Sequence, residues 1–184
     1  NVNEVYFTSV NDILIRPLTV ETMPAEINGL VYVPASVFDN TVTGVNLGMY
    51  CNQSSTNNVV TLYSLRQMLV FDLGRGITYD QHSGEQMPAK AINRNGRIYL
   101  PMKTVCDFFK LDGACYYTKY GRLVRIRNSA AWQSDAEFIK NAGASMENAL
   151  REFLREQQPV EPPQVEPDNK PPVQPPEKTQ VQVN

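Results

Sequence analysis

The chain has 184 residues, of which 42% are hydrophobic and 20% are charged, and its formal net charge is −2. These proportions are ordinary for a globular protein. The small net charge gives no electrostatic reason to expect binding to nucleic acid or to an anionic membrane. No run of the sequence approaches the ~20 apolar residues that span a bilayer.

Proline divides the chain into two parts, because eight of its 13 prolines lie after residue 157. We therefore predict a folded body over residues 1–157 and a proline-rich linker over residues 158–184. The charged residues of the linker account for the whole net charge of −2. Such a segment favours extended polyproline II, in which about 20 residues reach roughly 60 Å. We expect the linker to lead to a further, downstream domain.

Taken in chain order, the body begins with "EVYFTSVNDILIRPL", which predicts two strands. A first unit then has a tight turn at Asn28–Gly29, a strand to Val33, a helix after Pro34, a hairpin around "QSSTNN" and a strand over 59–62. Asn-Gly favours such a turn because both residues adopt positive φ readily. The next stretch, "RQMLVFDLGRGITYD", predicts a hairpin that turns at Gly74–Gly76.

A second unit begins with a turn at Asn95–Gly96 and a strand over 97–100. Pro101 cannot extend a ladder, but its fixed φ suits the first position of a helix. The apolar face of that helix follows the i, i+3, i+4, i+7 spacing and consists of Met102, Val105, Cys106 and Phe109. We expect Gly113 to be its left-handed cap, and a hairpin to turn near 119–121.

Residues 134–157 predict a C-terminal helix. Ser134 and Glu137 form a capping box at its start. Gly143 is expected to bend or break the helix, and Trp132, just before it, to anchor it to the body.

The two units are related in sequence. "MPAEINGLVYVP" from Met23 returns as "MPAKAINRNGRIYLP" from Met87, which places the repeat units at about 10–65 and 66–127. The predicted fold class is therefore α+β and mostly β, with duplicated strand–short helix–hairpin units followed by a C-terminal helix.

This order of elements resembles the copper amine oxidase N-terminal-like domain, or stalk domain, of bacterial surface proteins. The resemblance covers roughly residues 10–127 and is carried by Asn95–Arg97, Tyr99–Pro101 and Gly113–Ala114. The basic residue that is usual two positions after the proline is Lys103 in the second copy but Ser36 in the first. Likewise, Leu30 stands in the first copy where the second has the typical arginine.

The resemblance implies a non-catalytic accessory or spacer module of a secreted or cell-surface bacterial protein. Such a module positions a downstream catalytic domain, for example a polysaccharide deacetylase. It is expected to bind cell-wall polysaccharide or another surface protein. The resemblance implies no copper site, and we assign no catalytic, metal-binding or cofactor-binding residue to the chain.

Tyr116, Tyr117 and Tyr120 gather in the last predicted hairpin and are the candidate residues for stacking against sugar rings. The plainer interpretation is that they are ordinary strand aromatics, packed on the core or covering an edge. Neighbouring residues of a strand face opposite sides, so Tyr116 and Tyr117 cannot share one platform unless a bulge intervenes.

The remaining reactive residues have structural interpretations. His82 is the single histidine and lies in a polar stretch with the composition of a turn. Cys106 lies on the apolar helix face, where a thiol packs as a small hydrophobe. Cys51 and Cys115 hold similar places in the two copies, so they form either a disulfide bridge or two free thiols.

Two other classes of function stay open. The body could be an enzyme acting on glycans through a pair of carboxylates drawn from Glu26, Asp39, Asp80 and Glu85. Alternatively, it could be a protein–protein interaction module that uses a strand edge or the terminal helix. The sequence does not set the oligomeric state.

Overall fold

The computed structural model describes residues 4–54, 56–128 and 133–159. The strands are β1 (Tyr6–Val10), β2 (Ile13–Leu14), β3 (Ala25–Ile27), β4 (Leu30–Pro34), β5 (Tyr50–Ser54), β6 (Val59–Tyr63), β7 (Met68–Asp72), β8 (Ile77–Asp80), β9 (Gln86–Met87), β10 (Ile92–Arg94), β11 (Arg97–Pro101), β12 (Asp112–Thr118) and β13 (Gly121–Arg127). The helices are the 3-10 turn η1 (Ala35–Phe38), α1 (Asn40–Thr43), α2 (Met102–Phe109) and α3 (Asp135–Glu156).

The strands form three sheets. The terminal sheet has the order β12-β13-β1-β2, the central sheet has the order β10-β11-β4-β3, and the meander sheet has the order β5-β6-β7-β8-β9. Within the terminal sheet, β1 runs parallel to β13, so the start and the end of the body meet side by side.

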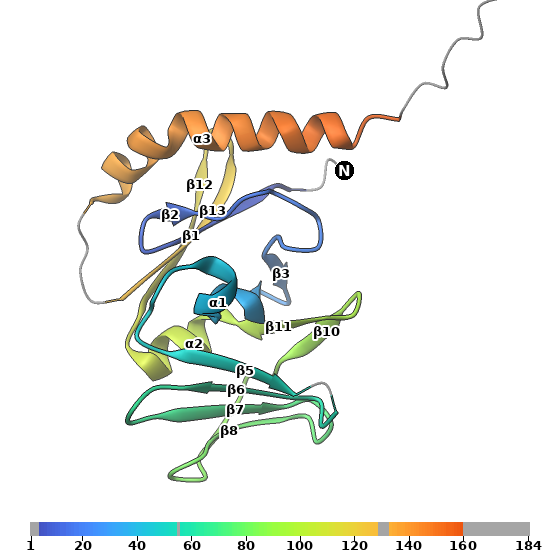
Figure 1. Cartoon of the computed structure of the whole chain (residues 1–184), viewed down its shortest axis with the longest axis vertical. Coiled ribbons are helices and arrows are strands. Elements are labelled where there is room, and N and C mark those ends of the chain that lie inside the picture. Colours follow the sequence, from blue (N-terminus) through green and yellow to red (C-terminus); the bar gives the residue numbers. More distant parts are fainter. Residues whose placement is uncertain (1–3, 55, 129–132, 160–184) are drawn as a thin grey trace, which may run out of the picture.

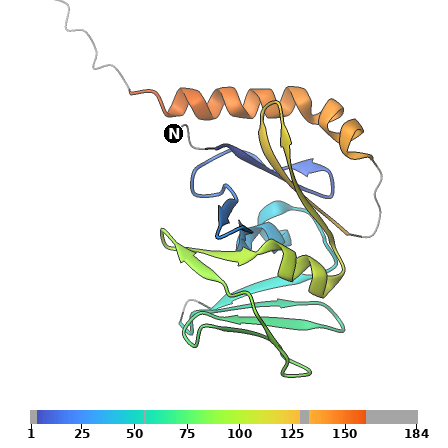
Figure 2. The same ribbon diagram turned by 180° about the vertical axis from the view of Figure 1, so that it is seen from behind.

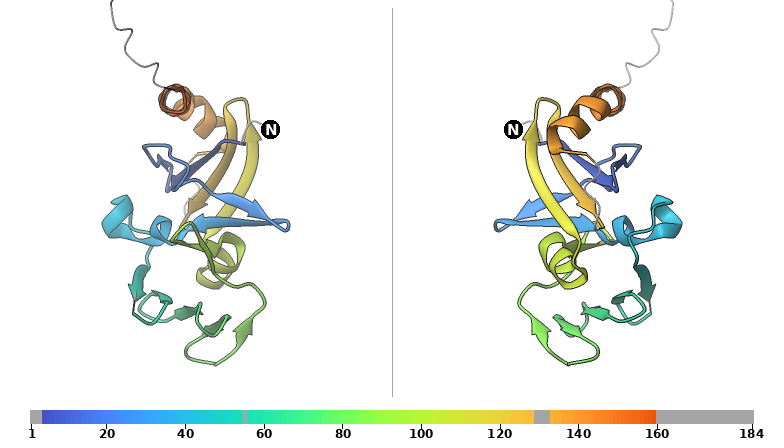
Figure 3. Two further views of the ribbon diagram at one scale, coloured as in Figure 1. Left: turned by 90° about the vertical axis from the view of Figure 1, so that its right-hand side faces the viewer. Right: turned by 90° about the vertical axis from the view of Figure 1, so that its left-hand side faces the viewer.

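The sheets are stacked along the long axis of the molecule. In Figure 1, α3 crosses one end above the terminal sheet, the central sheet and short helices lie in the middle, and the meander sheet closes the other end. Figure 2 shows the same order from behind, and Figure 3 shows it from the sides. One hydrophobic core runs through the layers, from Met146 of α3 through Phe7 of β1 and Leu100 of β11 to Phe71 of β7.

The two copies meet in the central sheet. Strands β4 and β11 pair antiparallel so that Val33 lies opposite Leu100, its own counterpart in the other copy. Both strands follow tight turns of the same kind, with φ of 51° at Asn28 and 53° at Asn95. A local pseudo-twofold axis therefore relates the strand pairs β3–β4 and β10–β11.

Beyond this pair the copies diverge. The first continues through η1 and α1 into β5–β6, which β7 extends as an antiparallel neighbour. The second continues through the single helix α2 into β12–β13, which β1 extends as a parallel neighbour. The predicted fold class, mostly β with a C-terminal helix, is confirmed.

Three local predictions were wrong. The left-handed residue that ends α2 is Lys110, whereas Gly113 lies in β12, where a Cβ atom would come within 2.6 Å of Cys106 Sγ. Helix α3 is not broken at Gly143 but continues through it, and a Cβ there would lie 3.1 Å from the Tyr120 hydroxyl. Gly113 and Gly143 thus allow α2 and α3 to pack closely against their neighbours. The third wrong prediction concerns Pro101, which does join the ladder, opposite Tyr32.

The helix predicted over 134–157 is present as α3, with the capping box of Ser134 and Glu137 formed. None of the described helices is both long and apolar enough to cross a membrane. Trp132 and the linker beyond residue 159 lie outside the described residues, so their predictions stay untested.

Candidate functional site

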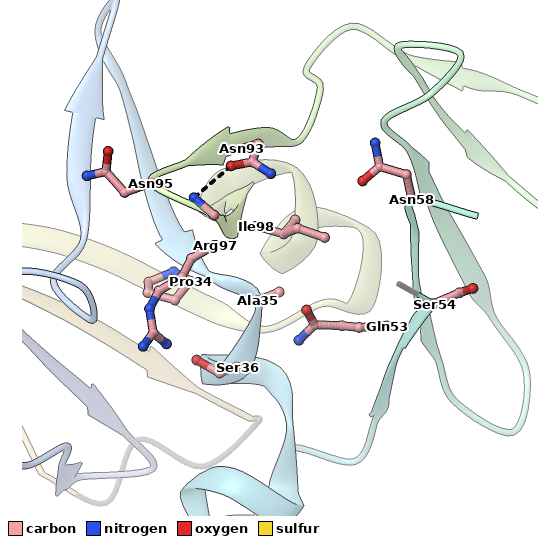
Figure 4. A pocket seen from close by; sticks show the side chains of 11 residues that line it. Pro34, Ala35, Ser36, Gln53, Ser54, Asn58, Asn93, Asn95, Arg97 and Ile98 are labelled. Atoms are coloured by element: carbon pink, nitrogen blue, oxygen red, sulfur yellow. Dashed lines mark hydrogen bonds between the residues drawn. The ribbon is translucent and has the colours of Figure 1, made fainter. Parts of the chain in front are cut away.

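An open pocket of about 640 Å³ lies between the hairpin β10–β11 and the hairpin β5–β6 (Figure 4). We refer to it as the amide pocket. Its apolar lining comes from Pro34 and Ala35, where β4 runs into η1, and from Ile98 of β11. Because the two copies meet along β4 and β11, the pocket contains residues of both. Its volume is in the range of small-molecule sites.

Four side-chain amides line this pocket, from Gln53, Asn58, Asn93 and Asn95. Each amide carries two N–H donors and a carbonyl acceptor. The Asn93 Oδ1 accepts a hydrogen bond from the backbone N–H of Gly96 at 3.0 Å, drawn as a dashed line in Figure 4. This bond fixes the orientation of the amide and leaves its NH₂ group free to donate to a ligand.

The Ser36 hydroxyl and the Arg97 guanidinium complete the polar lining. Ser54 follows Gln53 in β5, so its hydroxyl faces the other side of the strand, where it accepts a hydrogen bond from the backbone N–H of Asn57 at 3.3 Å. Ser36 lies in η1, on the opposite wall. Arg97 is exposed and is the one charged residue of the lining. None of the ion pairs found within the described residues includes it.

A second pocket, of about 670 Å³, holds the corresponding place in the other copy. It contains Leu30 and Lys103, and the offset of 67 residues that relates Val33 to Leu100 relates these two to Arg97 and Ser36. Its other lining includes Met87, Pro88 and Phe108, so we refer to it as the apolar pocket. Two of the positions at which the copies differ in sequence therefore line two corresponding cavities, one polar and one apolar.

The structure does not bring the three predicted tyrosines together on one surface. The Tyr116 hydroxyl donates to Asp135 of α3 at 3.0 Å, and Tyr120 packs beneath the same helix at Gly143. Tyr117 points the other way and is 74% exposed. Stacking of a sugar on Tyr117 stays a prediction.

Tyr117 has a rigid support on its inner side. The guanidinium of Arg122 lies 4.8 Å from the centre of the Tyr117 ring and 5.0 Å from that of Tyr6. The same guanidinium is ion-paired with Glu26 of β3. These contacts tie the terminal sheet to the central sheet, and they give Arg122 a structural role.

Three of the four carboxylates considered for catalysis have local partners. Asp39 accepts from the backbone N–H of Thr41 at 2.9 Å and caps α1. Asp80 accepts from the backbone N–H of His82 at 2.8 Å, within the exposed turn after β8. Glu26 pairs with Arg122, and Glu85 is exposed in the same turn as His82. None of these four carboxylates lines the amide pocket.

All three cysteines are free thiols. Burial, reinforced by nearby carboxylates, raises the pKa of Cys51 and of Cys106 to about 12. Burial also raises the pKa of Cys115. Thiols that stay protonated are poor nucleophiles, which agrees with a packing role for Cys106. Within the described ranges, no group of three histidine, cysteine or acidic residues is placed to hold a metal ion.

Sequence reasoning missed the amide pocket because its residues have the composition of turns. The asparagines of "NQSSTNN" and "INRNGR" predict tight turns, and they do form them. The sequence signal that could have revealed the pocket is a pair of differences between the two copies. Leu30 in the first copy corresponds to Arg97 in the second, and Ser36 corresponds to Lys103. Comparison of the chain with protein-family models, with curated proteins and with solved structures found no match.

Proposed function

We propose that this chain is a non-catalytic accessory module that binds a polysaccharide in the amide pocket. By the resemblance to stalk domains, we place it in a secreted or cell-surface bacterial protein, where the linker would hold it at a distance from a downstream, polysaccharide-directed catalytic domain. The observation that carries the proposal is the gathering of four residues with side-chain amides and the Ser36 hydroxyl around one cavity.

The chemistry of this lining suits a sugar. Each sugar hydroxyl both donates and accepts a hydrogen bond, and a side-chain amide offers both functions at a fixed spacing. The Asn93 amide is already oriented by the turn, so little conformational entropy is lost when a ligand binds. Ile98 and the Pro34 ring supply apolar contacts for the C–H faces of a sugar ring.

The test is a direct binding measurement with matched variants of the two turns. Asn95→Gly removes one lining amide and keeps a residue that tolerates the positive φ of 53°. Asn28→Gly makes the same change at the equivalent turn, which lines neither pocket. Isothermal titration with soluble cell-wall oligosaccharides should show Asn95→Gly weakening binding about fivefold, the value of one hydrogen bond. Asn28→Gly should leave the affinity unchanged.

Two results would contradict the proposal. Equal affinity for both variants and the unchanged chain would show that the sugar binds elsewhere. Release of new reducing ends from the polysaccharide, abolished by Glu26→Gln or Asp80→Asn in a folded protein, would show that the chain is an enzyme.

A further inference from the structure

We propose that Arg97 makes the amide pocket selective for saccharides that carry a carboxylate, such as uronic acid polymers. This inference rests on the proposed function, since it names the class of sugar that the same pocket would take.

The first argument is the isolation of the charge. Arg97 is the one charged group among the residues that line the pocket. It forms none of the ion pairs within the described part of the chain. Arg94, which lies directly opposite Arg97 on the paired strand β10, is instead placed over the Tyr99 ring, with its guanidinium carbon 5.5 Å from the ring centre. Arg97 thus remains available to an anion that enters the pocket.

The second argument is the contrast with the apolar pocket. There the counterpart of Arg97 is Leu30, and the positive charge comes from Lys103, which is ion-paired with Asp107 one helical turn away. In the amide pocket the counterpart of Lys103 is Ser36, a small residue without charge. Of the two equivalent cavities, only the amide pocket therefore presents an uncompensated cation.

The third argument is the match of shape. A guanidinium is a planar fork of N–H donors that holds a carboxylate through two parallel hydrogen bonds. In Figure 4 the Arg97 side chain runs past Pro34 towards Ser36, on the other face of the hairpin from Asn93 and Ile98, and the Gln53 amide lies across from Ser36. A sugar acid bound along this wall would place its carboxylate at the guanidinium and its ring hydroxyls at the Ser36 hydroxyl and the Gln53 amide.

The test compares each acidic sugar with its own neutral form. The probes are oligomers of galacturonic, glucuronic and mannuronic acid, each as the free acid and as the carboxyl methyl ester, and the unchanged chain is titrated with both forms. We expect at least one acid to bind about fivefold more tightly than its ester at low ionic strength. The difference should shrink in 0.5 M salt, where charges are screened.

Two variants carry the same change of net charge. Arg97→Gln should abolish the preference, so that the acid and its ester bind this variant equally well. Lys103→Gln, in the apolar pocket, should keep the preference intact. An acid and an ester that bind equally well would overturn this inference while the proposed function stands. Neutral wall oligosaccharides that bind when none of the acids does would overturn it as well. If no saccharide of either kind binds, the proposed function fails first, and this inference with it.

Discussion

A buried arginine attaches α3 to the body, and its removal should be costly. Arg125 of β13 is 1% exposed, and its Nε and Nη2 donate to Asp12 Oδ1 at 2.9 and 2.6 Å. It is also ion-paired with Asp135 in the first turn of α3, and its guanidinium lies 4.7 Å from the centre of the Phe138 ring. One side chain therefore links the β1–β2 turn, the terminal sheet and the helix.

The substitution Arg125→Met removes the charge and keeps an unbranched side chain of similar length. The Asp12 side chain, 7% exposed, would then hold an unpaired charge away from water. Breaking a buried ion pair in this way costs about 3–5 kcal/mol. For a chain of this size each kcal/mol lowers the melting temperature by about 2–4 °C, so we expect a fall of about 6–20 °C. Circular dichroism during heating and in urea measures both quantities.

Arg151→Met is the matched control, because Arg151 and its partner Glu147 are 69% and 58% exposed. Exposed pairs of this kind contribute at most about 0.5 kcal/mol. The double variant Arg125→Met with Asp12→Asn should be more stable than Arg125→Met alone, since no buried charge is left without a partner. If Arg125→Met and Arg151→Met differ by less than about 0.5 kcal/mol, the reasoning about the buried cluster is refuted.

Two further predictions concern the packing of α2 and the buried thiols. Gly113→Ala places a methyl group against Cys106 Sγ and should cost about 1–3 kcal/mol, whereas Gly74→Ala, which meets its nearest neighbour at 3.5 Å, should be close to neutral. Adding Cys106→Ala should recover part of the loss, and strictly additive costs in urea unfolding would contradict this contact. The raised pKa values of Cys51 and Cys106 mean that the unfolded chain releases these protons first as the pH rises above about 9. Stability should therefore fall between pH 7 and pH 10 by about 1 kcal/mol for each thiol, and a fall of the same size in the Cys51→Ala, Cys106→Ala variant would exclude this cause.

Local patterns were sufficient to predict the hairpins and the terminal helix. Asn28–Gly29, Asn95–Gly96 and the glycines at 74 and 76 have few conformations other than a turn, and alternating apolar residues mark the strands beside them. The capping box at Ser134 likewise fixes the start of α3 from neighbouring residues alone.

Contacts between distant residues could not be predicted in this way. The parallel pairing of Phe7 with Leu123 joins the two ends of the body. Nothing in the sequence of either strand predicts that it pairs with the other. Gly113 follows a helix and therefore looked like its cap, but the reason for glycine there is the approach of α2 to β12. The amide pocket arises for the same reason, because the antiparallel pairing of β4 with β11 brings asparagines of separate turns to one cavity.

The most direct test of saccharide binding in the amide pocket is a two-dimensional ¹⁵N–¹H NMR titration of the chain with wall oligosaccharides, including the uronic acid probes. We predict that the largest shifts fall on the side-chain amides of Gln53, Asn93 and Asn95, with little change at Asn28 on the opposite turn. Shifts centred on Tyr117, or no shift at saturating oligosaccharide, would contradict the account.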